Sequence, residues 1–362
     1  MVEILTFERA IDASGNAKRN LLLGNGFSIA CDHTIFNYAS LYAEAANTIQ
    51  TAMPQVHKLF ERLDTKDFEE VIRRLYHAWS VLPFYLPEDH DTPHKIHDHT
   101  NQLKELLIST LADNHPDIPA SVPDEKFAAC RRFLAHFICP AVNDGRVYTL
   151  NYDLLLYWAL MHNEVDGEDT IDIHKNDGFG KEEPDSDYII WKNEDHTKDQ
   201  RVFYLHGAVH LFDAGTELEK YTWINSGKRL IEQAREALQS NKFPLFVAEG
   251  KSDAKLEKIK HQPYLHHCYK SFLSATKESK RGNDLPKSLF IFGHSLDAND
   301  DHIIGKIAKG SISNLFVSIY GNQTSDDNRR IISKAEGLSN LRDTRHPLNV
   351  RFYNAETAQV WG

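Results

Sequence analysis

The chain has 362 residues, of which 41% are hydrophobic and 26% are charged, a composition typical of a folded protein with one large domain or two ordinary ones. Its formal net charge of −11 argues against a protein whose overall field attracts nucleic acid or an anionic membrane, although a local basic patch remains compatible with that charge. The four cysteines form no C-x-x-C pair, which fits a reduced, cytoplasmic setting and excludes a zinc ribbon built from cysteines.

The start of the chain does not predict a targeting segment. Glu3 and Glu8 interrupt the first apolar residues, so we expect no signal peptide. The apolar run Leu154–Met161 is much too short to span a bilayer, and we expect no membrane segment.

The first predicted strand is Leu21–Leu23, which ends at Gly24-Asn25-Gly26. Two glycines allow a sharp turn and a close approach of the backbone to a ligand, and N–H groups in such a loop can hold a diphosphate. The full G-x-G-x-x-G pattern is missing, so an ordinary strand–turn–helix connection explains these residues equally well.

Residues 34–145 are predicted to be mainly helical. Apolar side chains recur at helical spacing, for example at Phe68, Val71 and Leu75 behind a helix start at Asp67. Such stripes are more often core or oligomer contacts than cofactor contacts. We therefore expect residues 34–145 to form a helical insertion, or cap, that emerges from a sheet domain.

Two groups of histidines could in principle bind a metal ion. Neither group has a recognised ligand spacing, so we expect no metal. The groups are His90, His94, His97 and His99, and His261, His266 and His267 with Cys268.

A second buried strand is predicted at Val147–Leu150, directly before Asn151 and Asp153. The carboxyl end of a strand is the usual ligand-binding edge of an α/β sheet, and polar side chains there can hold ribose hydroxyls or a water. Capping of the helix that follows explains the same two residues about as well.

The rest of the chain alternates between polar segments, strands and helices. Residues 163–200 are polar and acidic and are predicted to be a long surface excursion, which could cover a pocket. Further strands are expected at Arg201–His206, Lys242–Ala248, Leu289–Phe292, Asn314–Tyr320 and Val350–Tyr353. This alternation predicts a single α/β domain over residues 1–362, with a Rossmann-like, mostly parallel sheet flanked by helices.

Three of these strands end in glycine or polar residues. His206 ends the first, Gly293-His294-Ser295 follows Leu289–Phe292, and Asn322 follows Asn314–Tyr320. Asp300 and Asp301 then open a helix and are interpreted as caps, because acidic side chains are favoured in a first helical turn. No role is assigned to His294 or His210.

Four strand ends thus carry the motifs Gly24-Asn25-Gly26-Phe27-Ser28, Thr149-Leu150-Asn151-Tyr152-Asp153, Leu205-His206-Gly207 and Gly293-His294-Ser295-Leu296. Their types and order resemble the NAD-binding core of the sirtuin-like superfamily. The Gly-Asn-Gly-Phe form is closer to bacterial sirtuin-like, abortive-infection-type defence proteins than to protein deacetylases. The four-cysteine zinc module and the arginine loop of the deacetylases have no match here.

The resemblance implies that NAD is the substrate, that no metal is needed, and that the chain is an NAD hydrolase releasing nicotinamide and ADP-ribose. It also implies a role in bacterial anti-phage (abortive infection) defence, as a homo-oligomer or beside a partner protein such as an ATPase. No direct contact with nucleic acid or membrane is expected. An NAD-dependent ADP-ribosyltransferase or deacylase, and a non-enzymatic sensor of NAD or ADP-ribose, are the alternatives.

The resemblance also assigns the site. His206 is the expected general base, Asn151 would orient the water or a ribose hydroxyl, and Asp153 would accept from ribose or lock the turn. The expected NAD-binding residues are Gly24, Asn25, Gly26, Phe27, Ser28, Thr149, Asn151, Asp153, Gly293, Ser295 and Asn322.

Overall fold

The computed structural model describes residues 2–87, 90–162, 171–180, 188–191, 199–214, 217–222, 229–239, 244–278 and 285–362. Its centre is a seven-stranded sheet in the order β1-β12-β11-β10-β2-β3-β6, and every pair of neighbours is parallel. The strands are β1 (Ile4–Leu5), β2 (Lys18–Leu23), β3 (Val147–Thr149), β6 (Val202–Tyr204), β10 (Lys287–Phe292), β11 (Asn314–Ile319) and β12 (Asn349–Asn354).

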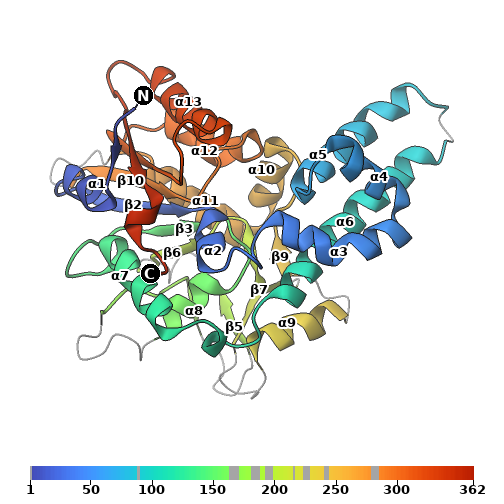
Figure 1. Cartoon of the computed structure of the whole chain (residues 1–362), viewed down its shortest axis with the longest axis horizontal. Coiled ribbons are helices and arrows are strands. Elements are labelled where there is room, and N and C mark those ends of the chain that lie inside the picture. Colours follow the sequence, from blue (N-terminus) through green and yellow to red (C-terminus); the bar gives the residue numbers. More distant parts are fainter. Residues whose placement is uncertain are drawn as a thin grey trace.

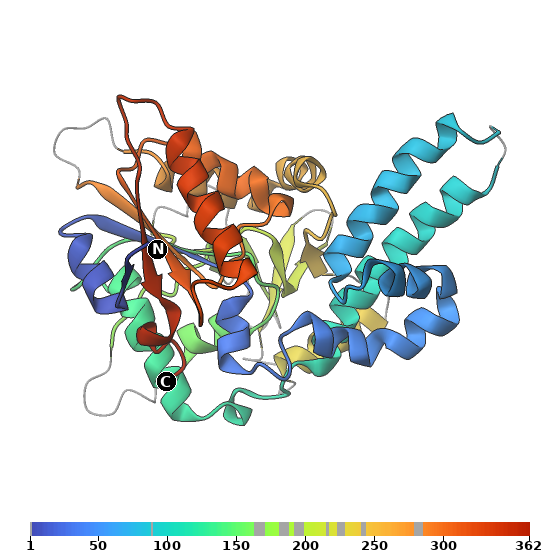
Figure 2. The same cartoon turned by 45° about the horizontal axis from the view of Figure 1, so that its top comes forward.

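The central strands are apolar along consecutive residues, because helices cover both faces of the sheet. Leu21, Leu22 and Leu23 are all fully buried. Figures 1 and 2 show α12 (Asp301–Ala308) and α13 (Asp326–Asn340) on one side, and α7 (Asp124–Ile138) and α8 (Leu155–Met161) on the other. The predicted α/β fold with a mostly parallel, helix-flanked sheet is confirmed.

A smaller antiparallel sheet includes the strand that comes directly after β6 in the chain. Its strand order is β4-β5-β8-β7-β9, and β7 (Gly207–Asp213) begins directly after His206. The other strands are β4 (Phe179–Gly180), β5 (Tyr188–Trp191), β8 (Leu218–Tyr221) and β9 (Pro244–Phe246). Part of the predicted polar excursion therefore forms strands β4 and β5, while its residues 163–170, 181–187 and 192–198 lie outside the described part of the chain.

Four helices project from the body as a helical arm, seen in Figures 1 and 2. They are α3 (Tyr38–Ala52), α4 (Pro54–Leu63), α5 (Phe68–Val81) and α6 (Thr92–Asn114). The start of α5 is capped as expected, since the Asp67 carboxylate accepts from the N–H groups of Glu69 and Glu70.

The insertion predicted for residues 34–145 is shorter in the structure, because its last helix belongs to the body. The rings of Phe133 and Phe137 on α7 lie 5.4 Å from Phe292 and 5.3 Å from Phe290, respectively. The apolar stripe of α7 is thus buried against the sheet, whereas those of α3–α6 are largely buried within the arm.

The remaining helices complete the layers around the two sheets. They are α1 (Phe7–Ala13), α2 (Gly26–Cys31), α9 (Leu230–Gln239), α10 (Ser252–His261) and α11 (Pro263–Ala275). Among the described helices, none combines the length and apolar character needed to cross a membrane.

The loops after β2 and β10 pack backbone against backbone. A Cβ on Gly26 would lie 2.6 Å from the Cα of Gly293, and one on Gly24 would lie 2.7 Å from the Gly293 carbonyl oxygen. Gly293 itself has a φ of +66°, which favours glycine. These three glycines are therefore required by the contact between two loops of the fold.

We expect Gly26→Ala to lower the free energy of unfolding by about 2 kcal/mol, because the two loops must move apart to admit a methyl group. Gly337→Ala is the control, since a Cβ there would meet nothing within 4 Å and alanine favours the surrounding helix α13. Chemical denaturation measures both changes, and equal effects of the two substitutions would contradict the packing argument.

Candidate functional site

The four motif-bearing strand ends lie side by side at one edge of the sheet. Leu23 pairs with Phe292 of β10 and with Thr149 of β3, and Thr149 pairs with Tyr204 of β6. Neighbouring strands are about 4.8 Å apart, so Asn151 and His206, each two residues past a paired position, leave the sheet as neighbours.

The strand order also reverses here. From β2 the chain continues through β3 to β6 on one side, and then returns to β10, β11 and β12 on the other. The loops after β2 and β10 therefore flank a topological switch point, where open α/β sheets usually bind their ligands.

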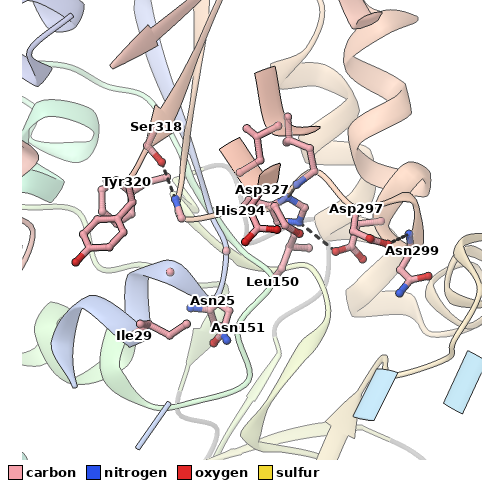
Figure 3. Close-up of a pocket in the computed structure, with 18 of the residues that line it drawn as sticks. Asn25, Ile29, Leu150, Asn151, His294, Asp297, Asn299, Ser318, Tyr320 and Asp327 are labelled. Carbon is pink, nitrogen blue, oxygen red and sulfur yellow. Dashed lines mark hydrogen bonds and ion pairs between the residues drawn. The ribbon is translucent and has the colours of Figure 1, made fainter. Parts of the chain in front are cut away.

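A large open pocket of about 2440 Å³ occupies this edge (Figure 3). Single small molecules usually fill about 300–1,000 Å³, so this pocket can take an extended ligand. Most of the expected site residues line it, namely Gly24, Asn25, Gly26, Asn151, Asp153, His206, Gly293 and Ser295.

Four expected contact residues lie outside the lining of this pocket. Phe27 is a core residue whose ring packs 5.1 Å from that of Trp361. The Thr149 hydroxyl accepts from the N–H of Asn151, and the Asn322 side chain accepts from the N–H of Thr324, so both shape turns. Ser28, the fourth, is fully buried.

Ser28 connects the two central loops beneath the pocket. Its hydroxyl donates to Asp153 Oδ2 at 2.5 Å and accepts from Nδ2 of Asn151 at 2.8 Å. Asp153 Oδ1 accepts from the N–H of Leu155, the first residue of α8. Burial raises the pKa of Asp153, and the hydrogen bond from Ser28 counteracts that rise. Asp153 thus locks the turn, which is one of the two roles expected for it.

This arrangement fixes the orientation of the Asn151 carboxamide. Because its NH2 group donates to Ser28, its Oδ1 atom faces elsewhere, and that oxygen is buried with no hydrogen-bond partner among the described residues. A buried acceptor without a partner is costly, so a ligand or water that donates to it would be stabilised.

Fewer backbone N–H groups of the glycine loop are available to bind a ligand than the sequence predicts. The N–H groups of Gly24 and Gly26 donate to the carbonyls of Phe292 and Gly293, and those of Phe27 and Ser28 donate to carbonyls within the loop. The prediction that these four N–H groups bind a diphosphate is therefore wrong, because they already donate to backbone carbonyls of the fold. Within the loop, the N–H of Asn25 has no acceptor among the described residues.

His206 lies at the inner wall of the pocket and is only 2% exposed. Burial, and then the charge of Lys255, hold its pKa well below the usual range, so the ring is neutral at neutral pH. The Nε2 atom lies 3.0 Å from Nε2 of His302 and 3.9 Å from Oδ1 of Asp300.

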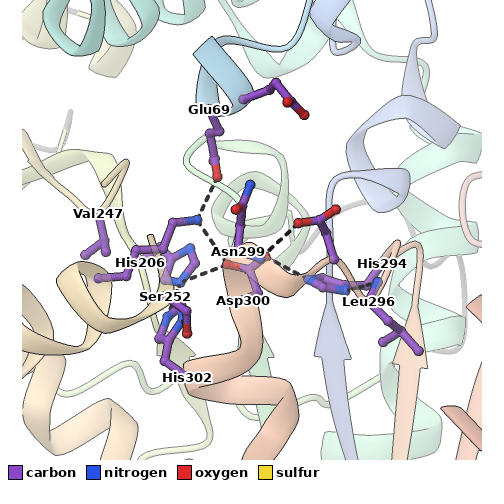
Figure 4. Close-up of polar contacts among 12 residues, drawn as sticks. Glu69, His206, Val247, Ser252, His294, Leu296, Asn299, Asp300 and His302 are labelled. Carbon is purple, nitrogen blue, oxygen red and sulfur yellow. Dashed lines mark hydrogen bonds and ion pairs between the residues drawn. The ribbon is translucent and has the colours of Figure 1, made fainter. Parts of the chain in front are cut away.

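Asp300 is the centre of this cluster (Figure 4). It pairs with the ammonium of Lys255 at 3.0 Å and with Nε2 of His294 at 3.1 Å. Lys255 is fully buried and also pairs with Glu69 of the arm at 2.6 Å. Burial raises the pKa of Asp300, but Lys255, the hydrogen bond from His294 and the charges of the nearby histidines together keep it well below its usual range.

Two interpretations from sequence are corrected here. Asp300 makes no side-chain cap at the start of α12, and its carboxylate instead joins His206, His294 and Lys255. His294, which has no role in the sequence-based interpretation, accepts from the N–H of Leu296 through Nδ1 and therefore donates to Asp300 through Nε2. Lys255 and Glu69 come from distant helices, and no local pattern marks them.

His206, Asp300 and His302 also bring three possible metal-ligand atoms within 4.8 Å of one another, the only such group among the described residues. The ammonium of Lys255 lies 3.0 Å from Oδ1 of Asp300. A cation in that position opposes a second one.

The wall near His206 carries negative charge. Asp67, Glu69, Asp297 and Asp300 all line the pocket, and after burial their charges raise the pKa of the half-buried Tyr38. Burial and the neighbouring Glu69 raise the pKa of Asp67 to about 6. Glu69 and Asp300 already pair with Lys255, so Asp67 and Asp297 are the carboxylates of this wall that can attract a cationic group.

The comparison with protein families gives one match. The profile described as Domain of unknown function (DUF4917) matches residues 21–361. None of the curated proteins matches the chain.

We expect Lys255→Met to lower the free energy of unfolding by about 3 kcal/mol, because it leaves two largely buried carboxylates without their cation. Lys258→Met on the same helix is the matched control. Its ammonium pairs with Glu249 but is 37% exposed, so its loss should cost about 1 kcal/mol or less. Similar losses in urea denaturation for both variants would contradict the buried-charge assignment.

The pKa of Asp67 also predicts a pH dependence of stability. Its raised pKa means that the folded state binds this proton more tightly than the unfolded state. The contribution of Asp67 to the free energy of unfolding therefore falls as pH rises from about 4 to about 6. An asparagine at this position would keep the cap without the charge. Asp67→Asn should therefore be more stable than wild type by about 2 kcal/mol above pH 6, with the gain vanishing near pH 4. A gain independent of pH in denaturation curves would refute this.

Proposed function

We propose that this chain, which belongs to the family described as Domain of unknown function (DUF4917), uses water to cleave NAD into nicotinamide and ADP-ribose. The observation that carries the proposal is the meeting of two groups in one pocket at the switch point. These are the Oδ1 atom of Asn151, which has no partner in the described part of the chain, and the neutral ring of His206.

The position of the pocket supports a dinucleotide. Ligands of open parallel sheets bind at the carboxyl ends of strands beside the switch point, and the volume is sufficient for an extended molecule. The sirtuin-like motifs found in the sequence supply the same expectation independently of the geometry.

Carboxylates near His206 support placing the nicotinamide end of NAD there. The nicotinamide ring of NAD is cationic, and cleavage of its bond to ribose moves positive charge onto the sugar while nicotinamide leaves as a neutral molecule. Asp67 and Asp297 line the pocket and favour both cationic states.

The two polar groups have complementary roles in this reaction. Asn151 Oδ1 accepts a hydrogen bond from the attacking water or from a ribose hydroxyl. His206 accepts the proton that the water loses as its oxygen bonds to the ribose carbon. The balance is NAD⁺ and water giving nicotinamide, ADP-ribose and one proton. A positioned general base contributes about two to four orders of magnitude in rate.

The resemblance extends the proposal to bacterial anti-phage defence, and to assembly as a homo-oligomer or with a partner such as an ATPase. The expected cytoplasmic location belongs to the same proposal. Measurement of cellular NAD during phage infection, with and without this gene, tests that extension separately from the chemistry.

The direct test measures nicotinamide release from NAD by purified protein. Asn151→Ala and His206→Ala should each lower the rate by about 100-fold or more while the melting temperature remains close to that of wild type. His97→Ala is the control, because His97 is an exposed histidine of the arm, outside the pocket lining.

Two results would contradict the hydrolase, and a third would contradict the assignment of Asn151 and His206. NAD that is bound but not consumed by wild type indicates a sensor, and ADP-ribose recovered on an acceptor molecule indicates a transferase or deacylase. Equal rates in wild type and both pocket variants would remove the assigned residues from the reaction.

A further inference from the structure

The two ring nitrogens of His206 have different surroundings. Nε2 lies 3.0 Å from Nε2 of His302, and the two rings are nearly parallel, at 13° with centroids 5.2 Å apart. Among the described residues, the hydrogen bond and the ion pair of the His206 ring both involve Nε2 and not Nδ1. Since His206 lines the pocket, Nδ1 is the nitrogen left for a ligand.

Two Nε2 atoms at this distance must share one proton, because two lone pairs would repel and two N–H groups would clash. Either His206 donates to His302 or the reverse. The choice decides which nitrogen of His206 holds a lone pair, and therefore whether the ring can act as a base toward the pocket.

Two observations place the proton on His206. Asp300 Oδ1 lies 3.9 Å from Nε2 of His206, and a nearby carboxylate favours an N–H at that atom. The Nδ1 atom of His302 lies 3.4 Å from the hydroxyl of Ser252, which can accept its N–H. A neutral His302 has a single N–H, and donating it to Ser252 leaves Nε2 as an acceptor.

We infer that His302 is a positioning residue for His206: it accepts the Nε2 proton and leaves the Nδ1 lone pair of His206 directed to the pocket. In this arrangement the proton taken from water goes to Nδ1, and the ring becomes an imidazolium whose Nε2–H points toward His302 and Asp300. The catalytic part of this inference rests on the proposed hydrolysis, whereas the tautomer does not.

The surroundings of His302 suit an acceptor. It is 3% exposed, and burial lowers its pKa to about 4, so it is neutral at the pH where the base must work. Its Nδ1 lies 3.4 Å from the hydroxyl of Ser252 on α10, which limits rotation of the ring. His302 and Asp300 come from adjoining turns, so the start of α12 holds both partners of Nε2.

The tautomer can be measured without substrate. Long-range ¹H–¹⁵N correlation spectra of the full chain, labelled at histidine ring nitrogens, distinguish Nε2–H from Nδ1–H rings, and His206→Gln assigns the signal. We expect His206 in the Nε2–H form and His302 with a bare Nε2. A His206 signal in the Nδ1–H form, a charged ring at pH 7, or a metal-bound Nε2 would overturn the inference. This readout does not depend on NAD cleavage.

Kinetics then test the positioning role. His302→Leu removes the acceptor and should lower kcat by about 100-fold, while KM stays within about threefold. His302→Gln offers Oε1 as an acceptor and should retain kcat within about fivefold of wild type. Equal losses in the Leu and Gln variants, or no loss in either, would show that acceptance of the Nε2 proton does not matter. Melting temperatures establish that both variants are folded.

Discussion

The register of four parallel strands determines where the polar residues of this chain meet. β10, β2, β3 and β6 end at the same level, so the loops behind them open onto one edge of the sheet. Asn151 and His206 are each two residues past paired positions, and their relative placement is set by the ladder of backbone hydrogen bonds. Groups held in this way keep a reacting geometry better than groups on long loops.

The contact between the loops after β2 and β10 depends on glycine, because glycine has no side chain. The loops after β2 and β10 approach so closely that a single methyl group on Gly24, Gly26 or Gly293 would force them apart. Ser28 follows this contact in the chain, and its hydroxyl forms hydrogen bonds with Asp153 and Asn151. The same short segment therefore closes the fold and orients the carboxamide.

Buried charges connect the helical arm to the surroundings of His206. Lys255 lies between Glu69 of the arm and Asp300 of the body, and Asp300 in turn contacts two histidines. Although the arm projects from the sheet domain in Figure 2, its helix α5 supplies one of the charges that determine the electrostatics near His206. A change in the position of the arm would alter that balance.

Much of the architecture could be predicted from sequence, because buried parallel strands have continuous apolar runs and end in recognisable residues. Leu21–Leu23 with Gly24, and Val147–Leu150 with Asn151, are examples. The cluster around Asp300 could not, since Lys255, Glu69 and His302 meet only through tertiary packing. Glycine in the first loop predicts a diphosphate because it allows close approach, yet the group that approaches is the backbone of Gly293.

If the chain hydrolyses NAD as proposed, the scissile bond of the dinucleotide lies between Oδ1 of Asn151 and the ring of His206 at this sheet edge. A crystal structure of the His206→Gln variant with NAD would show this arrangement. We expect the nicotinamide ribose within hydrogen-bonding distance of Asn151 Oδ1, with its anomeric carbon facing residue 206. A dinucleotide bound elsewhere, or with its adenine end at residue 206, would rule out hydrolysis at this site.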